Sequence, residues 1–507
     1  MAAKTAPIQP FEATPLDVIS SSISQLRATY NSLRTKDIQF RLKQLRKLYW
    51  GIVDYTPQLE EAILKDLHKG THETTITEIA WSKNECLDLI NNLEKWAKDE
   101  PVVNVPAAFW AMGHRIRHEP LGVILVIGAF NYPVQLALVP AIGAIAAGNA
   151  VLLKPSEGAP HTAMVLQRIF EEYLDPESYF CVNGALPESQ AILDHKFDKI
   201  VFTGSRSVGK IIARKAAETL TPTLLELGGQ NPAFISKHAD IKLAARRLMW
   251  AKCLNAGQVC LSQNYALVER SVLSQFIGEL HNSYRTFMPQ GAKASPDYCR
   301  INNKANFDRL KKMLDSSKGK IVLGGSMDEA DLFIEPTVVL VDDVEDSLII
   351  EETFGPIWTV MAWDSLDWAI DVANKVDPTP LSLFTFGNDA ENDRGSCIGL
   401  SLSPIYSHSF ELQHSNTLYS TPQCYLRRRH RQRCLFSCIT DLGALWRCWA
   451  VWQWYLPRLL LLQGIQPPAH RCPGSRLDGR PSPCPLHALC SLRSQALHAH
   501  VGQEAQL

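Results

Sequence analysis

Two continuous apolar runs, joined by an apolar helical stretch, constrain the fold of this chain more than any other feature. The first run, LGVILVIGAF, covers residues 121–130, and the second, AVLLKP, covers residues 150–155. A run without polar alternation is typical of a strand buried on both faces. Parallel strands need a helical crossover, and the stretch that ends before Gly148 supplies one. We therefore predict a βαβ unit over residues 121–155.

The same alternation continues along the chain and predicts two α/β domains. Further strands are predicted in SYFCVNG, DKIVFTGS and TPTLLELGG, and, less regularly after residue 231, in NPAFI, YALVE, KIVLGG, PTVVLV, WTVMAW and LSLFTFG. Helices are expected in DIQFRLKQLRKLYWGIVD, over residues 78–96, and from about Val208. We expect a Rossmann-like cofactor domain over residues 1–228 and a second, catalytic α/β domain over residues 229–393. Ligands of such sheets bind at the carboxyl ends of the strands.

Charge and targeting signals narrow the class of protein. The 507 residues include 51 Lys and Arg against 52 Asp and Glu, a formal net charge of −1. Nucleic acid as a partner is not expected, because such partners draw on a large basic excess. The N-terminus has neither an apolar signal region nor an Arg-rich amphipathic face, so a cytoplasmic location is expected. The cysteines lack the paired spacing of metal sites, and we predict no metal.

The last part of the chain differs in composition from the rest. Lys375 is the last lysine, and the segment 394–507 is rich in Arg, Pro and Cys. We interpret it as translation in a wrong frame or through an unspliced intron, and expect a disordered tail. Sequencing the transcript across this junction tests that hypothesis. Nucleic-acid binding by RRRHRQR is a weaker alternative, because runs of charged residues are common. Zinc binding by the tail cysteines is weaker because their spacings are irregular. A membrane anchor is weaker because the apolar stretch is too short to span a bilayer.

The sequence GSRSVGK follows a predicted strand and opens a predicted helix. Exposed amides at a helix N-terminus favour phosphate, and the glycines Gly204 and Gly209 allow it to approach. A P-loop would continue with Ser or Thr after Lys210, but Ile211 stands there, so a nucleotide triphosphatase is not expected. A dinucleotide pyrophosphate needs no such hydroxyl.

Cys260 in NAGQVC and Glu226 in LELGG are the candidates for covalent chemistry. An isolated cysteine is more often a buried, inert thiol. The Asn, Gly and Gln around Cys260 instead indicate a tight polar turn that leaves the sulfur reachable. A nucleophilic thiol works with a nearby base, and Glu226, between two leucines at a strand end, supplies a carboxylate.

Over about residues 15–390 the chain resembles the aldehyde dehydrogenase family, most closely the class 3 group of fatty aldehyde dehydrogenases and their fungal relatives that oxidise apocarotenals. The resemblance rests on six motifs in order: GAFNYP, GNAVLLKPSE, FTGSRSVGK, LELGGQNP, NAGQVC and EETFGP. It implies that Cys260 attacks the aldehyde, that Asn131 and the Cys260 amide hold the oxyanion, and that Glu226 activates water. It also implies cofactor contacts by Lys154, Glu157, Gly204, Ser205, Gly209, Glu352 and Phe354.

The resemblance further implies a cofactor, a substrate class and an assembly. A carboxylate such as Glu157 near the ribose repels a 2′-phosphate, so NAD is expected, with NADP as the alternative. Substrates are expected to be medium- or long-chain aliphatic or apocarotenoid aldehydes. Family members are homodimers, some anchored to membranes, but the family's glycine-rich loop and dimer arm do not appear after residue 393. The rival hypothesis is therefore a catalytically inactive or misfolded binding or scaffold protein.

Overall fold

The computed structural model describes residues 7–102 and 105–392. The segment 394–507, and with it the expectation of a disordered tail, lies outside the described residues. Within the described part of the chain, no helix is both long and apolar enough to cross a membrane. The cytoplasmic location expected from the N-terminal sequence stays a prediction.

The first half of the chain forms a five-stranded parallel sheet, with strand order β5-β4-β3-β6-β7. The strands are β3 (Val123–Ile127), β4 (Ala150–Lys154), β5 (Tyr179–Cys181), β6 (Lys199–Gly204) and β7 (Thr223–Leu227). The crossover helices are α6 (Gln135–Ala146), α7 (Pro160–Tyr173), α8 (Leu186–Leu193) and α9 (Arg206–Glu218). The predicted βαβ unit over residues 121–155 is confirmed as β3-α6-β4.

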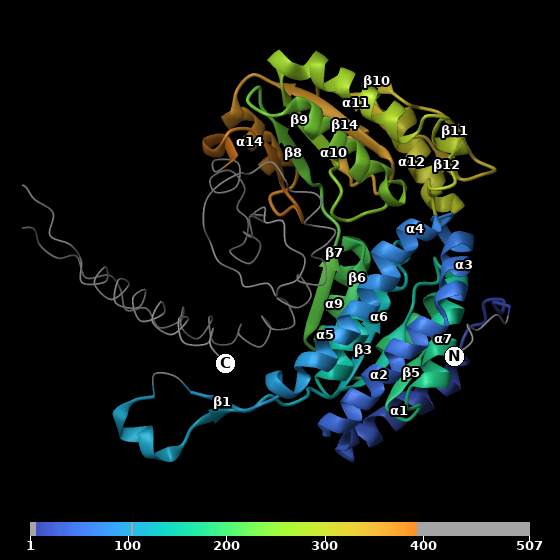
Figure 1. The fold of residues 1–507 in the computed structure, drawn as a ribbon, viewed down its shortest axis with the longest axis vertical. Coiled ribbons are helices and arrows are strands. Elements are labelled where there is room, and N and C mark those ends of the chain that lie inside the picture. The colour runs from blue at the N-terminus through green and yellow to red at the C-terminus, as the bar shows by residue number, and fades with distance from the viewer. Residues whose placement is uncertain (1–6, 103–104, 393–507) are drawn as a thin grey trace, which may run out of the picture. The chain divides into compact units, whose positions relative to one another are not determined.

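Both faces of this sheet are covered, which is why its strands are apolar without alternation. Ile124 and Val126 of β3 pack in one core with helices from the N-terminal part of the chain, α6 and α7, whereas Val123 and Leu125 pack in the other core with α1, α8 and α9. The N-terminal helices, gathered beside this sheet in Figure 1, are α1 (Leu16–Asn31), α2 (Ile38–Asp54), α3 (Thr56–Leu67) and α5 (Ala80–Trp96).

Two predicted helices begin at positions other than those expected. The helix placed at residues 78–96 is α5 from Ala80, and it is preceded by the short helix α4 (Thr71–Thr74) and by one turn of π-helix, η2 (Thr75–Ile79). The helix expected from about Val208 is α9, which begins at Arg206 because the Ser205 side chain caps it by accepting from the Val208 amide, 3.3 Å away.

The second half forms a six-stranded sheet with strand order β10-β13-β14-β9-β8-β15. Its strands are β8 (Pro232–Ile235), β9 (Tyr265–Glu269), β10 (Lys320–Leu323), β13 (Thr337–Leu340), β14 (Ile357–Trp363) and β15 (Phe384–Phe386). Only β10 runs antiparallel to its neighbour. Five of the six strands lie within segments predicted as strands, and β14 begins one residue before the predicted segment WTVMAW. The chain passes between the sheets after Leu227 and before Pro232, while the division into domains at residues 228 and 229 stays a prediction.

One hydrophobic core joins the second sheet to its helices. These helices are α10 (Ile241–Cys253), α11 (Leu273–Phe287), α12 (Lys304–Ser316), α13 (Ser347–Ile350) and α14 (Leu366–Val376). Trp358 of β14, fully buried, is among the largest side chains of this core. The remaining short helices are η1 (Arg34–Lys36), η4 (Leu254–Gly257), η5 (Arg270–Val272) and η6 (Ala292–Ala294).

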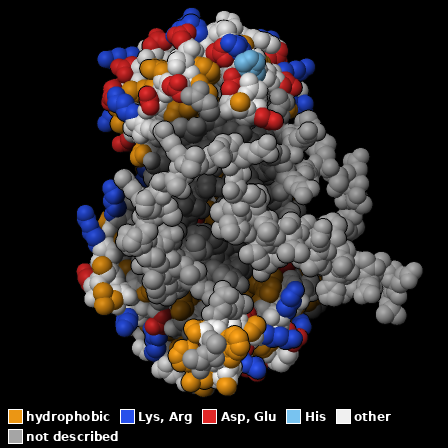
Figure 2. Space-filling model, turned by 90° about the vertical axis from the view of Figure 1, so that its left-hand side faces the viewer, with side chains coloured by type: hydrophobic (Ala, Val, Ile, Leu, Met, Phe, Trp, Pro, Cys, Tyr) orange, Lys and Arg blue, Asp and Glu red, His pale blue; other side chains and the backbone are white. Residues whose placement is uncertain are grey.

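Two small antiparallel hairpins complete the described fold. One pairs β11 (Met327–Asp328) with β12 (Phe333–Ile334), and the other pairs β1 (Glu100–Pro101) with β2 (Arg115–Ile116), with η3 (Ala107–Met112) between them. Figure 1 shows the β1–β2 hairpin extending away from the neighbouring helices. Its apolar tip is exposed: Trp110 is 73% and Met112 66% accessible. Figure 2 shows hydrophobic side chains gathered at this end of the molecule.

Candidate active site

The carboxyl-end edge of the first sheet carries most of the predicted site residues. Because β4, β3, β6 and β7 are parallel neighbours, their carboxyl ends lie along one edge. Asn131 follows β3, Lys154 ends β4, Gly204 ends β6 and Glu226 is the penultimate residue of β7. Residues far apart in the sequence are thus brought to one edge by the strand order.

Cys260 follows a strained turn at the end of α10. Asn255, Ala256 and Gly257 all have left-handed backbone angles, with φ of 48°, 50° and 69°. Such angles cost energy for residues with a Cβ and persist only where the surroundings fix them. Here the Asn255 side-chain amide donates to the carbonyl oxygens of Asn131 (2.8 Å) and Gln258 (3.1 Å).

Partial burial and two nearby carboxyl groups determine the acidity of the Cys260 thiol. Of the five cysteines that the structure describes, Cys260 alone is partly exposed. Loss of water around the sulfur, followed by the negative charges of Glu352 and Glu226, raises the pKa of Cys260 to about 12. The thiol is therefore protonated near neutral pH, and a base or a nearby positive charge is needed to activate it.

Glu226 is suited to proton transfer near neutral pH. It pairs in register with Thr203 on β6 and is half-buried. Burial raises the pKa of Glu226 to about 7. A carboxyl group with such a pKa can act as a general base at physiological pH.

Glu352 lies against the turn that follows β7. A Cβ added to Gly228 would come within 2.1 Å of the Glu352 Oε2 atom, so the glycine makes room for this carboxylate. Burial raises the pKa of Glu352 to about 7, and the positive charge of the buried Lys252 opposes that rise. The Arg309 guanidinium holds the same loop by donating to the carbonyl oxygens of Glu352 (3.2 Å) and Thr353 (2.6 Å).

Phe354 completes the EETFGP loop. It has a left-handed φ of 45°, which is rare for an aromatic residue. Its ring meets the ring of Phe130 edge to face, with centroids 5.8 Å apart. This contact joins the EETFGP loop to the GAFNYP loop, two motifs more than 200 residues apart in the sequence.

Asn131 joins the two halves of the site. Its side chain is buried, and its Nδ2 donates to the Gln258 carbonyl oxygen at 3.0 Å. Its own carbonyl oxygen accepts from Lys69 Nζ (3.1 Å) and from Asn255 Nδ2 (2.8 Å). The Asn131 amide uses one of its two hydrogens in the bond to Gln258, which leaves the other available.

Most of the residues predicted to hold a dinucleotide lie at or just after the ends of β4 and β6, the two strands that flank β3 in the first sheet. Lys154 Nζ donates to Glu157 Oε2 at 2.6 Å, with the lysine buried and the glutamate half-exposed. Gly209 brings α9 close to the sheet, because a Cβ there would come within 2.8 Å of Leu227 on β7, whereas a Cβ on Gly204 would meet the Phe202 ring of its own strand at 2.5 Å. The first turn of α9 thus presents its amides at the strand end.

Several residues of this site were missed by the sequence analysis. Lys69 and Glu78 are fully buried, and Glu73 accepts from the Asn255 amide at 2.9 Å. Burial raises the pKa of Glu73 to about 7. Charged residues in helical patterns normally face water, so the sequence gives no sign of this burial beyond the apolar neighbours of Glu78.

Comparisons with known proteins agree with this geometry. The family described as "Aldehyde dehydrogenase family" matches residues 5–391. The chain is 64% identical over 387 residues to the "Beta-apo-4'-carotenal oxygenase" of Gibberella fujikuroi, which covers 76% of this chain and 72% of that protein. It is 38% identical over 371 residues to the "Aldehyde dehydrogenase, dimeric NADP-preferring" of Rattus norvegicus, and this match covers 73% of this chain and 81% of that protein.

A solved structure supports the same assignment. The substrate-bound state of Staphylococcus aureus AldH matches with a TM-score of 0.72 and 37% identity, over 74% of this chain and 82% of that one. The fold and the ordered motifs define an oxidoreductase. The chain belongs to the aldehyde dehydrogenase family.

Proposed function

We propose that this protein oxidises aldehydes to carboxylic acids with a nicotinamide dinucleotide. In this proposal Cys260 is the nucleophile, Asn131 and the Cys260 amide bind the oxyanion, and Glu226 activates water. The observation that carries it is the position of Cys260, partly exposed and within the electrostatic reach of two carboxyl groups whose pKa values burial raises to about 7, Glu226 and Glu352.

The proposed chemistry has two halves. In the first, Cys260 gives up its proton to solvent water and its sulfur bonds to the aldehyde carbon, while Asn131 donates to the developing oxyanion of the thiohemiacetal. When bound, the oxidised cofactor supplies a hydride acceptor and a positive charge that favours the thiolate. In the second half, Glu226 takes a proton from water, which attacks the resulting thioester. The carbon–sulfur bond breaks, the carboxylic acid leaves, and the Cys260 sulfur regains a proton from Glu226.

The residues present fit a dinucleotide. A Cβ on Gly204 or Gly209 would collide with a neighbouring side chain, so both positions need glycine. The capped first turn of α9 offers amides to a pyrophosphate. Ser205 would contact the pyrophosphate at this turn, and the Lys154–Glu157 pair would hold the adenosine ribose. Glu352 and Phe354 would position the nicotinamide ribose.

NAD is the proposed cofactor, with NADP as the alternative. The Glu157 carboxylate would repel a 2′-phosphate, whereas the Lys154 ammonium would attract it, and the two groups lie 2.6 Å apart. The rat relative is named as NADP-preferring. Comparing kcat/KM with NAD and NADP tests the preference. Glu157→Gln should raise the efficiency with NADP relative to that with NAD, and an unchanged ratio would remove Glu157 from the argument.

The proposed substrates are medium- or long-chain aliphatic aldehydes or apocarotenoid aldehydes. A small hydrophobic cluster of Tyr132, Leu136 and Val259, with Leu261 packed against it, adjoins Cys260 in the sequence and the fold. The Gibberella relative is named for a carotenal. A panel of aldehydes of increasing chain length should give rising kcat/KM, whereas a preference for acetaldehyde would contradict this substrate class.

We also propose that two copies assemble through the β1–β2 hairpin. The exposed apolar tip, with Trp110 and Met112, supports such a contact, and the rat relative is named as dimeric. Trp110→Glu should shift the mass in analytical ultracentrifugation from dimer to monomer. A monomeric wild-type chain would contradict the assembly.

The alternative function is a binding or scaffold protein without catalytic activity. The loss of the family's sequence pattern after residue 393 favours it, because the missing segment carries part of the family's active-site surroundings. A folded, cofactor-binding chain that gives no aldehyde-dependent NADH would support this alternative.

The test of the proposed enzyme is NADH formation by the purified full chain with a long-chain aldehyde. Cys260→Ser should abolish the activity while cofactor binding, followed by fluorescence titration, persists. Cys86→Ala is the matched control, since Cys86 is buried in the core beside the first sheet. Activity that survives in Cys260→Ser would overturn the assignment of the nucleophile.

A further inference from the structure

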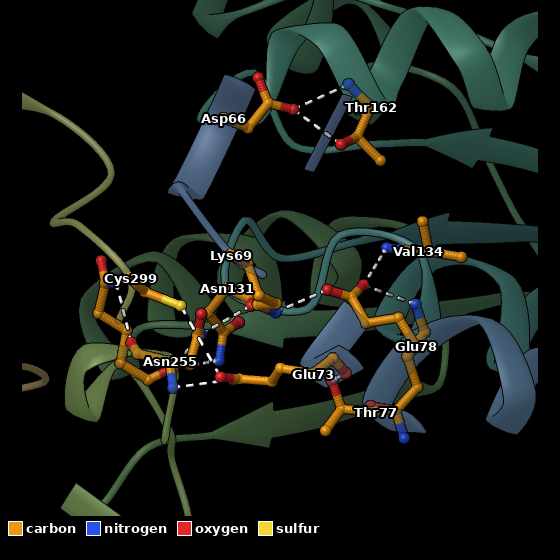
Figure 3. A network of polar contacts seen from close by, with 12 residues as sticks. Asp66, Lys69, Glu73, Thr77, Glu78, Asn131, Val134, Thr162, Asn255 and Cys299 are labelled. Atoms are coloured by element: carbon orange, nitrogen blue, oxygen red, sulfur yellow. Dashed lines mark hydrogen bonds and ion pairs between the residues drawn. The ribbon is translucent and has the colours of Figure 1, made fainter. Parts of the chain in front are cut away.

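An ion pair with no exposure to water lies behind the oxyanion asparagine. Lys69 and Glu78 are both fully buried, and Lys69 Nζ lies 2.7 Å from Glu78 Oε1. Burying two charges is costly unless further hydrogen bonds satisfy them, so such pairs mark positions where geometry matters. Figure 3 shows this pair in contact with the segment that carries Asn131.

The two charges hold the two ends of one short segment. Lys69 Nζ donates to the Asn131 carbonyl oxygen at 3.1 Å and lies 4.1 Å from the centre of the Tyr132 ring. Glu78 Oε2 accepts from the amides of Val134 (2.8 Å) and Gln135 (3.4 Å). The segment between β3 and α6 is therefore held from both sides. The Lys69 ammonium binds the carbonyl oxygen of Asn131, and the Glu78 carboxylate binds the amides of Val134 and Gln135.

The π-helical turn η2 is the local feature that accompanies this arrangement. Glu78 lies in that turn, between α4 and α5. A π turn inserts one residue into an α-helix and so rotates the following side chains by roughly 100°. It places Glu78 toward α6, whose N-cap residue Val134 has no capping side chain of its own. Glu78 replaces that cap, and its charge suits the positive end of α6.

The clamp is coupled to the nucleophile turn. The Asn131 carbonyl oxygen accepts from Lys69 and also from the Asn255 side chain, which in turn donates to Gln258. The Asn131 side-chain amide donates to the same Gln258 carbonyl. Fixing the Asn131 backbone thus fixes the carboxamide relative to the residues that lead to Cys260.

We propose that Lys69 and Glu78 are a positioning pair for the oxyanion donor: they hold the Asn131 backbone so that one carboxamide N–H is spent on Gln258 and the other serves the reaction at Cys260. This inference rests on the proposed function. Neither residue touches the substrate, so both act through Asn131. The rival explanation is a structural pair that only fastens α6 to the N-terminal helices.

The test is a comparison of acylation rates in two backgrounds. With 4-nitrophenyl acetate, the Cys260 sulfur forms a thioester, the ester C–O bond breaks and 4-nitrophenolate is released, with no cofactor needed. The neutral double variant Lys69→Met/Glu78→Gln removes both charges of the pair. If the pair acts through Asn131, this variant should lower the acylation rate about 10- to 100-fold, a fraction of the loss expected for removing the donor itself. In an Asn131→Ala background it should change the rate less than 2-fold.

Controls separate positioning from general loss of structure. Tyr55→Phe removes another hydrogen bond of a buried residue, to Glu172 at 2.7 Å, and should leave the acylation rate unchanged. If the double variant does not fold, Glu78→Asp keeps the charge but shortens its reach, and should give a smaller loss that again depends on Asn131. The dissociation constant for the cofactor should stay the same in all variants.

The outcomes distinguish the two proposals. An equal loss of rate with and without Asn131, or no loss in a folded variant, overturns the positioning role and leaves the proposed enzyme intact. A folded wild-type chain that releases no 4-nitrophenolate and oxidises no aldehyde overturns both.

Discussion

The side-chain amide of Asn131 donates a hydrogen bond to the Gln258 carbonyl oxygen, 3.0 Å away. Gln258 lies two residues before Cys260, whereas Asn131 follows a strand of the other sheet. This bond places the proposed oxyanion donor next to the segment that carries the nucleophile. The separation of donor and nucleophile therefore depends on contacts between the two sheets, and not on either sheet alone.

Replacing Asn131 should affect acylation more than substrate binding. Asn131→Ala removes a donor aimed at charge that develops in the transition state, a loss of about 3–4 kcal/mol, or roughly 10²- to 10³-fold in rate. The pre-steady-state formation of NADH measures this step, and KM should change little. A variant with normal acylation would show that the Cys260 amide alone binds the oxyanion.

Replacing Glu226 should slow the release of the acid and not the formation of the thioester. Glu226→Gln removes the base, so steady-state turnover should fall by about 10²- to 10⁴-fold while a burst of NADH remains. In the wild-type chain turnover should rise with pH through about 7, because the ionised carboxylate is the active form and burial raises the pKa of Glu226 to about 7. The Glu226→Gln variant should lack this pH dependence, and retention of it would assign the titration to another group.

The strands and the site motifs were predictable because their patterns are local. β3 and β4 are apolar at nearly every position, as burial on both faces requires, and the turn before Cys260 carries the Asn and Gly that left-handed angles favour. The parallel βαβ repeat predicts that Asn131, Lys154 and Glu226 lie at one edge of a sheet. It does not predict the order of the strands in that sheet.

The buried charges could not be predicted, because their burial depends on contacts that are distant in the sequence. Glu78 begins an amphipathic pattern typical of a surface helix, yet its carboxylate meets Lys69 and the amide of Val134. The π turn that places it there has no sequence signature comparable to a cap or a glycine turn. Lys252 likewise is buried at the end of α10, where a lysine is usually exposed.

The Glu226 carboxylate should also cost the protein stability above neutral pH. Its pKa is 4.5 in the unfolded chain and about 7 in the fold, so the folded state binds more protons between these values and stability falls as pH rises through that window. Glu226→Gln removes this loss. Because the side chain is partly exposed, we expect the variant to be more stable than wild type by on the order of 1–2 kcal/mol at pH 8, with no difference near pH 4.5.

Urea unfolding at the two pH values measures this difference. The exposed Glu218, at the end of α9, provides the control substitution Glu218→Gln. A stability advantage of the Glu226→Gln variant that is equal at both pH values would contradict a charge effect and indicate a packing effect. Glu226, the proposed base, is then a residue retained for chemistry at the expense of stability.

Gly257 should be the glycine least tolerant of substitution at the site. It has a left-handed φ of 69°, and a Cβ there would lie 2.2 Å from the Gly355 carbonyl oxygen. That contact packs the nucleophile turn against the EETFGP loop, and a backbone oxygen cannot rotate away as a side chain can. Gly257→Ala should therefore cost about 2–4 kcal/mol in urea unfolding and lower the acylation rate as Cys260 shifts.

Gly291→Ala is the matched control. Its φ is 84°, but nothing lies within 4 Å of the added Cβ, so backbone strain alone should cost about 1 kcal/mol. Equal losses for the two variants would show that strain, and not the close approach of Gly355, requires glycine in the turn.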